Sequence, residues 1–279
     1  MKTRFRWPGK RFLLYFSVIF IAVMTLFPYY WLIISSFKPP PELVRAQPTL
    51  FPETFTLQNY ILVFKETNFI QYIRNSSLVG GITALVSTLL AIGAAYSTTR
   101  LRFRERGFIT RLILVGYMFP PILILMPLYL SLSKLSLSNS LFGLTIVYIG
   151  LLAPFGAWLL RGFFASVPRE LEEAALIDGA SKFEALRLIF LPLVIPGIVS
   201  VVLYTFIMSW SEYLFALIFI TSEANKTVPL GLEAWMNQYT VEWGSLTAAA
   251  VIASLPALLF FFITSKLSRG FLFEGALKG

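Results

Sequence analysis

The sequence predicts an all-α polytopic membrane protein with six transmembrane helices, and three observations carry this prediction. First, 57% of the 279 residues are hydrophobic and only 13% are charged, with a mean hydropathy of +0.76. A soluble domain of this length could not bury so much apolar surface. Second, the apolar residues gather in six long runs. Third, most basic residues fall in short segments between those runs.

Each apolar run is long enough to cross a bilayer as a helix. About 20 residues rising roughly 1.5 Å each span the roughly 30 Å of hydrocarbon. The runs lack the alternation of barrel strands, which selects helices. The predicted spans are approximately 12–36, 76–98, 112–132, 141–160, 193–220 and 246–265. We find no repeat or linker, so residues 1–279 are predicted to form a single transmembrane domain.

The distribution of Lys and Arg predicts the orientation. An even number of spans places both termini on one side of the membrane. Of the 23 Lys and Arg residues, 17 lie in the termini and in connections 99–111 and 161–190. By the positive-inside rule these parts are cytoplasmic, in a multi-pass protein of the inner (plasma) membrane. The basic N-terminus precedes an apolar run without a cleavage site, which indicates an uncleaved anchor.

Composition excludes several classes of function. The chain has no cysteine and no histidine, so disulfides, zinc sites with thiolate or imidazole ligands, Cys nucleophiles and His-based acid/base catalysis are excluded. The net charge of +9 is concentrated in the connections, which indicates topology control and not nucleic-acid binding. The sequence contains no G-x-x-x-x-G-K-[ST] phosphate loop, so the chain alone cannot hydrolyse ATP.

Connection 161–190, called the coupling loop below, contains the signals of two short helices. Pro168 suits a first helical turn and Gly179 suits a left-handed end, which predicts a helix over about 169–178. Ser181 and Glu184 match a capping box, which predicts a second helix that Pro192 interrupts.

Each of these two helices has an apolar face. Leu171, Ala174 and Ala175 share a face of the first helix, and Phe183, Leu186 and Phe190 form a stripe on the second. Such a pair suits either a knob that docks in the groove of a partner or interfacial helices folded under the bundle. The residues alone leave both interpretations open.

A longer pattern decides between them. The loop reads Glu173-Ala174-Ala175, three residues, Gly179, nine residues, then Ile189-x-Leu191-Pro192. This resembles the EAA signature in the last large cytoplasmic loop of bacterial ABC-importer permeases. The chain is similar to their carbohydrate-uptake branch, of the maltose-transporter type, over nearly its whole length. Further matching segments are 56–60, 75–76, 95–103, 127–129 and 275–279, although the C-terminal one is slightly short.

The resemblance implies a type I ABC importer permease fold, with a coupling helix seated in a cleft of a separate ATPase. The implied docking residues are Leu171, Glu173, Ala174, Ala175, Asp178, Gly179, Ala180 and Ser181. The implied partners are a second, different permease subunit, two ATP-binding subunits, an extracytoplasmic sugar-binding protein and the lipid bilayer, without nucleic acid. No cofactor is expected on this chain, because ATP and Mg would lie on the ATPase, and no enzymatic activity is expected of it.

The fifth predicted span contains the candidate pathway residues. Glu212 is the one acid well inside a span, where a charge costs at least about a few kcal/mol. It either hydrogen-bonds a neighbouring helix or lines the substrate path. Tyr204, Trp210 and Tyr213 offer the aromatic and polar groups that bind sugars, but chance placement among 16% aromatic residues is the stronger interpretation. Prolines within the spans are interpreted as simple helix kinks in preference to hinges for alternating access.

The last outer connection is the candidate contact with the binding protein. It contains Trp235, Asn237, Gln238 and Tyr239, and the corresponding loop meets the binding protein in maltose-type permeases. Simple interfacial anchoring by Trp235 and Trp243 is the alternative.

The leading functional hypothesis is therefore a non-catalytic permease subunit of an ATP-driven sugar importer. A secondary, ion-coupled carrier would need intramembrane charge pairs or interrupted helices, and one acid supports it poorly. An intramembrane hydrolase is disfavoured because the sequence offers no convincing nucleophile and base.

Overall fold

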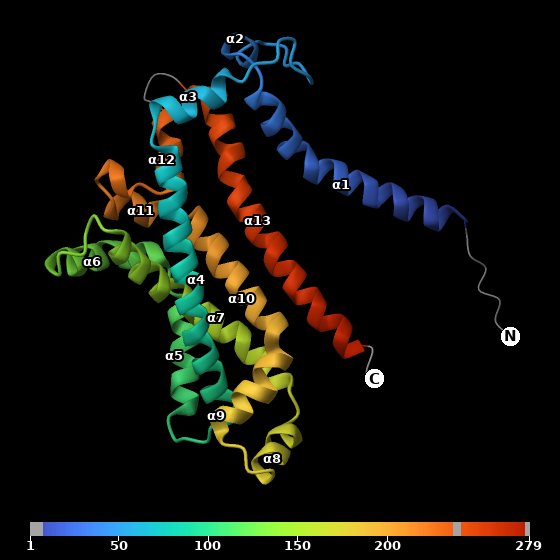
Figure 1. The fold of residues 1–279 in the computed structure, drawn as a ribbon, viewed down its shortest axis with the longest axis vertical. Coiled ribbons are helices and arrows are strands. Elements are labelled where there is room, and N and C mark those ends of the chain that lie inside the picture. Colours follow the sequence, from blue (N-terminus) through green and yellow to red (C-terminus); the bar gives the residue numbers. More distant parts are fainter. Residues whose placement is uncertain (1–7, 237–240, 277–279) are drawn as a thin grey trace. The chain divides into compact units, whose positions relative to one another are not determined.

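The computed structural model describes residues 8–236 and 241–276, and these residues are almost entirely helical (Figure 1). Apart from helices and loops, they contain one isolated antiparallel bridge between Met236 and Val241. Contacts divide the chain into two compact units. The first is Met1–Thr67 with Leu232–Ala253, and the second is Asn68–Gly231 with Ser254–Gly279.

The first unit contains one long apolar helix and a folded loop. Helix α1 covers Pro8–Ser36, and its apolar side chains from Leu13 to Tyr29 are exposed, as expected for a helix that faces lipid. Short helices α2 (Pro40–Leu43) and α3 (Gln58–Glu66) follow. The amide of Asn59 closes this loop by donating to the carbonyl oxygens of Ser36 and Lys38, at 2.8 Å each.

The second unit is built on three packed helices. Helices α4 (Phe69–Arg100), α7 (Leu141–Ser166) and α10 (Leu191–Ser211) run side by side (Figure 1). At their crossing, a Cβ on Gly156 would lie 2.9 Å from Val201 and 3.2 Å from Ala91. Only a residue without a side chain permits this approach.

The remaining helices of the chain are shorter or peripheral, except for the last. They are α5 (Arg106–Met118), α6 (Pro121–Lys134), α8 (Arg169–Ile177), α9 (Lys182–Ala185), α11 (Leu214–Phe219), α12 (Val228–Leu232) and α13 (Trp243–Ala276), which continues from the first unit into the second. Among the described residues, five helices are long and apolar enough to span a membrane, or six if α5 and α6 form one bent span. The predicted all-α membrane class is confirmed.

Two predicted spans are broken. Where the sequence predicts a span over 112–132, α5 and α6 are bent by 96° at Phe119–Pro120. Pro120 and Pro121 lack the N–H groups that would continue the helix. The predicted span 193–220 is divided at Glu212, which adopts an extended backbone between α10 and α11.

One expectation at the end of the coupling loop is wrong. Pro192 does not interrupt the second helix, because the chain is helical from Lys182 to Ser211. A π-helical turn over Leu186–Phe190 precedes the proline, and the Leu191 N–H donates to the carbonyl of Leu186. This shift in hydrogen-bond register accommodates the missing N–H of Pro192.

Candidate functional site

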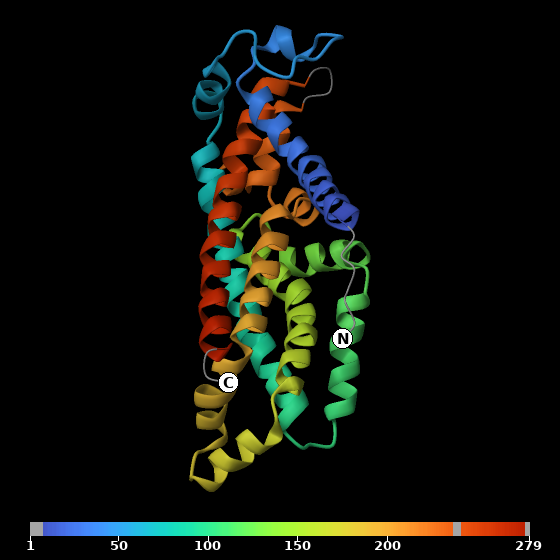
Figure 2. The ribbon, with the colours of Figure 1, turned by 90° about the vertical axis from the view of Figure 1, so that its right-hand side faces the viewer.

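The coupling loop forms a helix, a tight turn and a second helix beyond one end of α4, α7 and α10 (Figures 1 and 2). Helix α8 ends at Ile177, and Gly179 has a φ of +91°, which only glycine adopts without strain. The Ala180 N–H donates to the Ala175 carbonyl, which closes the turn. The predicted capping box is present, because Ser181 and Glu184 each accept a hydrogen bond from the other's backbone N–H.

Most residues implied as docking residues are exposed at this turn. Leu171, Glu173, Ala174, Asp178, Gly179 and Ser181 are exposed, and Ala175 and Ala180 are half-buried. Sequence reasoning missed Ile177, whose side chain is 85% exposed. An aliphatic residue beside the predicted helix end was the available signal. Phe183 is 70% exposed on the other side of the turn, so the tip presents apolar surface to a partner.

The predicted stripe on the second helix divides between two roles. Phe190 is fully buried and its ring lies 5.7 Å from Tyr96 and 6.0 Å from Phe164. Leu186 is half-buried, and only Phe183 is exposed. The stripe therefore fixes the loop to the bundle at one end and leaves one aromatic ring exposed at the other.

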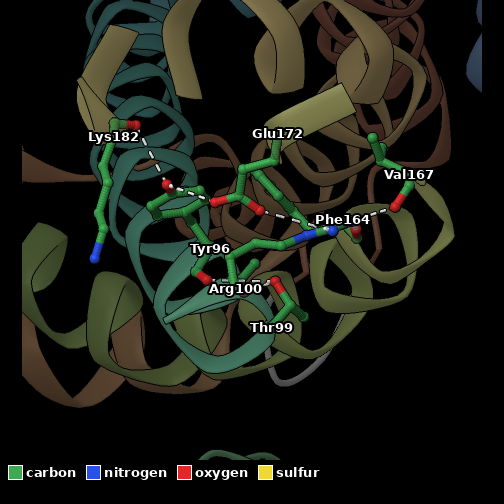
Figure 3. A network of polar contacts seen from close by, with 8 residues as sticks. Tyr96, Thr99, Arg100, Phe164, Val167, Glu172 and Lys182 are labelled. Atoms are coloured by element: carbon green, nitrogen blue, oxygen red, sulfur yellow. Dashed lines mark hydrogen bonds and ion pairs between the residues drawn. The ribbon is translucent and has the colours of Figure 1, made fainter. Parts of the chain in front are cut away.

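A buried arginine ties the coupling loop to the bundle (Figure 3). The Arg100 side chain is 3% exposed and donates to the carbonyl oxygens of Phe164 and Val167, at the end of α7. It also lies 3.9 Å from the Glu172 carboxylate of α8 and 4.6 Å over the Phe190 ring. One side chain at the end of α4 thus contacts α7, α8 and the π-helical turn.

Tyr96, one turn earlier in α4, adds a second connection (Figure 3). Its hydroxyl donates to the Lys182 carbonyl at 3.2 Å and lies 3.5 Å from the Glu172 carboxylate. Helices α8 and α9 are therefore held by the same end of α4. Neither Arg100 nor Glu172 was singled out from the sequence, because they lie 72 positions apart.

The candidate pathway residue Glu212 lies at the break between α10 and α11. Its carboxylate accepts hydrogen bonds from the backbone N–H groups of Phe215 (2.9 Å) and Ala216 (3.2 Å). It also accepts one from the Tyr148 hydroxyl of α7, at 2.6 Å. The acid therefore caps α11, where the helix dipole favours a negative charge, and links it to α7. Of the two interpretations, the hydrogen bond to a neighbouring helix is present, with Tyr148 as the partner.

The other candidate pathway residues have different neighbours. Trp210 is buried and stacks on Phe206 at 5.6 Å. The Tyr204 ring lies 4.1 Å from Phe155, whereas Tyr213 is partly exposed beside the break.

The candidate contact with a binding protein is described only in part. Trp235 is 3% exposed and belongs to the first unit. Asn237, Gln238 and Tyr239 lie outside the described residues. The role of this loop stays a prediction.

Comparison with known sequences places the chain in a family of transport proteins. A family model for the binding-protein-dependent transport system inner membrane component matches residues 87–272, which include this loop. The chain is 33% identical to the inner membrane ABC transporter permease protein YcjP of Escherichia coli (strain K12), over 95% of each chain. It is 34% identical to the trehalose/maltose transport system permease protein MalG of Thermococcus litoralis, over 97% of this chain and 98% of that one. The diacetylchitobiose uptake system permease protein DasC of Streptomyces coelicolor is 32% identical, over 94% of each.

Solved structures agree on the fold. A bacterial ABC transporter involved in the import of the acidic polysaccharide alginate matches with a TM-score of 0.76 at 21% identity, over 95% of this chain and 99% of that one. A chain of the MetNI methionine ABC transporter in an inward-facing conformation matches with a TM-score of 0.61 at 13% identity, over 78% of this chain and 99% of that one.

Proposed function

We propose that the coupling loop of this chain converts ATP hydrolysis by a partner into alternating access for a sugar. The chain belongs to the family of binding-protein-dependent transport system inner membrane components. The chain is a transmembrane permease subunit of an ABC importer. The observation that carries the coupling role is the exposed, capped turn at Gly179, held to the bundle by Arg100 and Tyr96.

The loop is built to transmit displacement. A push on α8 reaches α4 through Glu172 and Arg100, and reaches α7 through the carbonyl oxygens that Arg100 binds. The second helix continues without interruption from Lys182 to Ser211, where the Glu212 break begins. Movement at the tip therefore has a rigid helical path to the middle of the fifth span. A two-state change biased by nucleotide on the partner would use this path.

Sugar is the proposed substrate class. Two relatives that align with more than 90% of this chain are named for the transport of trehalose/maltose and of diacetylchitobiose. The proposed partners are a second, different permease subunit, two ATP-binding subunits that hold ATP and Mg, and an extracytoplasmic sugar-binding protein. We place both termini and the coupling loop in the cytoplasm, because 17 of the 23 Lys and Arg residues lie on that side. Catalysis belongs to the ATPase in this proposal, and this chain forms half of the pathway.

The helix break at Glu212 is the one observation that specifically favours an ion-coupled carrier, because such carriers bind ligands at interrupted helices. Here, however, the N-terminus of α11 is occupied by the chain's own carboxylate. The N–H groups of Phe215 and Ala216 are therefore not free to bind an anionic substrate. The geometry favours the importer.

The test is uptake by proteoliposomes that contain the full-length chain, a second permease and the ATPase, with binding protein and labelled disaccharide outside. We expect uptake that requires internal ATP and the binding protein. Uptake driven by an ion gradient without ATP would replace the importer with the carrier. ATP-dependent uptake of a non-sugar ligand of the binding protein would overturn the substrate class only.

A further inference from the structure

A cavity of about 780 Å³ lies beside the coupling loop, at the ends of α4 and α7. Its lining includes four arginines, Arg100, Arg106, Arg161 and Arg169, and none of its lining residues is acidic. Apolar side chains line the rest, among them Trp158, Leu159 and Phe163. The volume is in the range of small-ligand sites. A cavity that is cationic at one part and apolar at another fits a ligand with the same division.

Two of the arginines are committed to the protein. Arg100 donates to the Phe164 and Val167 carbonyl oxygens, and the Arg106 Nε donates to the Thr98 carbonyl at 2.6 Å. These bonds cover carbonyl groups at the ends of α4 and α7 that would otherwise repel an anion. The two guanidinium groups keep their positive charge in these bonds.

The other two arginines are uncommitted within the described part of the chain. The Arg161 Nε is a buried donor without a hydrogen-bond partner there, and no ion pair joins Arg161 or Arg169 to an acid. Among the four cavity arginines, the one ion pair recorded in the described residues joins Arg100 to Glu172, at 3.9 Å. A buried donor without a partner costs free energy, and clustered like charges repel, so an anion with several acceptor oxygens would relieve both.

The helix geometry favours the same ligand. Arg106 is the first residue of α5 and Arg169 is the first residue of α8, so two positive helix ends border the cavity. Trp158 lies one turn before Arg161 in α7, and tryptophan is enriched at the membrane interface. The charged part of the cavity thus lies where the headgroups of the cytoplasmic leaflet are expected.

We propose that this cavity binds the phosphate of an anionic phospholipid, with Arg161 and Arg169 as its principal ligands and with Trp158, Leu159 and Phe163 against the acyl chains. The phosphate diester offers the acceptor oxygens that guanidinium groups bind in pairs. Because the site borders the start of α8, the bound headgroup would brace the coupling loop from the membrane side. This inference uses the proposed cytoplasmic orientation but does not depend on the transported substrate.

The experiment measures phospholipid retained by the full-length chain, purified in detergent with its associated subunits. Native mass spectrometry and lipid extraction would follow titration with phosphatidylglycerol, and with phosphatidylcholine as the zwitterionic comparison. Arg161→Gln should weaken phosphatidylglycerol binding about tenfold or more, as expected for lost hydrogen bonds to a charged group. Arg161→Lys, which keeps the charge, should lose less.

The matched control is Arg104→Gln, which removes an equal charge from an exposed position of connection 99–111 outside the cavity lining. It should leave binding within about twofold of wild type, since exposed charges contribute little. Equal losses in Arg104→Gln and Arg161→Gln, or equal binding of the two lipids, would overturn the proposal. Displacement of the lipid by millimolar inorganic phosphate, with Arg161-dependent phosphate binding, would assign the site to a soluble anion and overturn the lipid. ATP-dependent uptake by the same variants, reconstituted into proteoliposomes, tests the proposed function separately.

Discussion

Two helix breaks lie before and within the fifth predicted span, one at Gly179 and one at Glu212, and the structure uses them in opposite ways. Both are helix breaks with a capping glutamate, Glu184 in one and Glu212 in the other. At Gly179 the cap holds the backbone while Ile177 and Phe183 remain exposed. At Glu212 the carboxylate accepts three hydrogen bonds from its own chain. The first break leaves surface for a partner, whereas the second joins α11 to α7.

The largest expected effect is a loss of ATPase binding and uptake at the first break, Gly179. Gly179→Trp places a side chain at a φ of +91°, which costs about 1–2 kcal/mol, and adds bulk to the exposed turn. We expect normal membrane insertion, loss of ATPase co-purification and at least a tenfold loss of uptake. Gly107→Trp is the control, because Gly107 has open space around it and an ordinary φ. Unchanged co-purification in the Gly179 variant would contradict the docking role.

At the second break, the expected loss is in stability. Glu212→Ala removes the acceptor for two backbone N–H groups and one hydroxyl, so we expect a loss of about 1–3 kcal/mol in the free energy of unfolding. The thermal unfolding midpoint of the purified subunit measures it, with exposed Glu170→Ala as control. Uptake per folded subunit tests the pathway role separately, and wild-type uptake kinetics would remove Glu212 from the pathway.

A smaller loss is expected from the partner of Glu212 on α7. Tyr148→Phe removes one hydrogen bond and keeps the ring, so the expected loss is about 1 kcal/mol. Combined with Glu212→Ala it should cost less than the sum, because the two side chains act as a pair. Full additivity would show that the hydroxyl and the carboxylate are energetically independent.

The smallest effect is expected at the cap of the first break. Ser181→Ala leaves the Glu184 N–H without its acceptor, and since the position is exposed we expect about 0.5 kcal/mol, confined to α9. Hydrogen exchange should accelerate at residues 182–185 and remain unchanged in α10. Ser166→Ala, at an exposed serine outside the capping box, is the comparison. Faster exchange throughout α10 would mean that the cap supports the whole helical run.

The coupling loop was predictable in detail because its signals are local. Proline, glycine and the Ser181–Glu184 pair each act within a few residues, and the structure has the helix ends and the cap where these residues place them. The π-helical turn before Pro192 was not predicted from the sequence. Whether the helix continues past the proline or ends there depends on tertiary packing, here that of the buried Phe190.

The contacts that fix the loop were not predictable from local patterns. In the sequence, Arg100 is one of several basic residues that set the topology, and only the approach of α4 to α8 makes it a partner of Glu172. Glu212 was recognised as an unusual acid, but its cap on α11 required knowing that the span breaks there. Side chains distant in sequence acquire their roles from the packing of α4, α7 and α10.

The most direct test of the docking role is a crosslink at the exposed tip. The chain has no cysteine, so Ile177→Cys provides a single thiol. Ile177 is the most exposed aliphatic residue of the coupling loop. With cysteines placed in turn along the cleft of the ATPase, we predict a disulfide-linked pair whose yield changes with ATP. Ser133→Cys, at the exposed end of α6, should give none. Absence of any crosslink from Ile177→Cys in an assembled, ATP-hydrolysing complex would contradict the account.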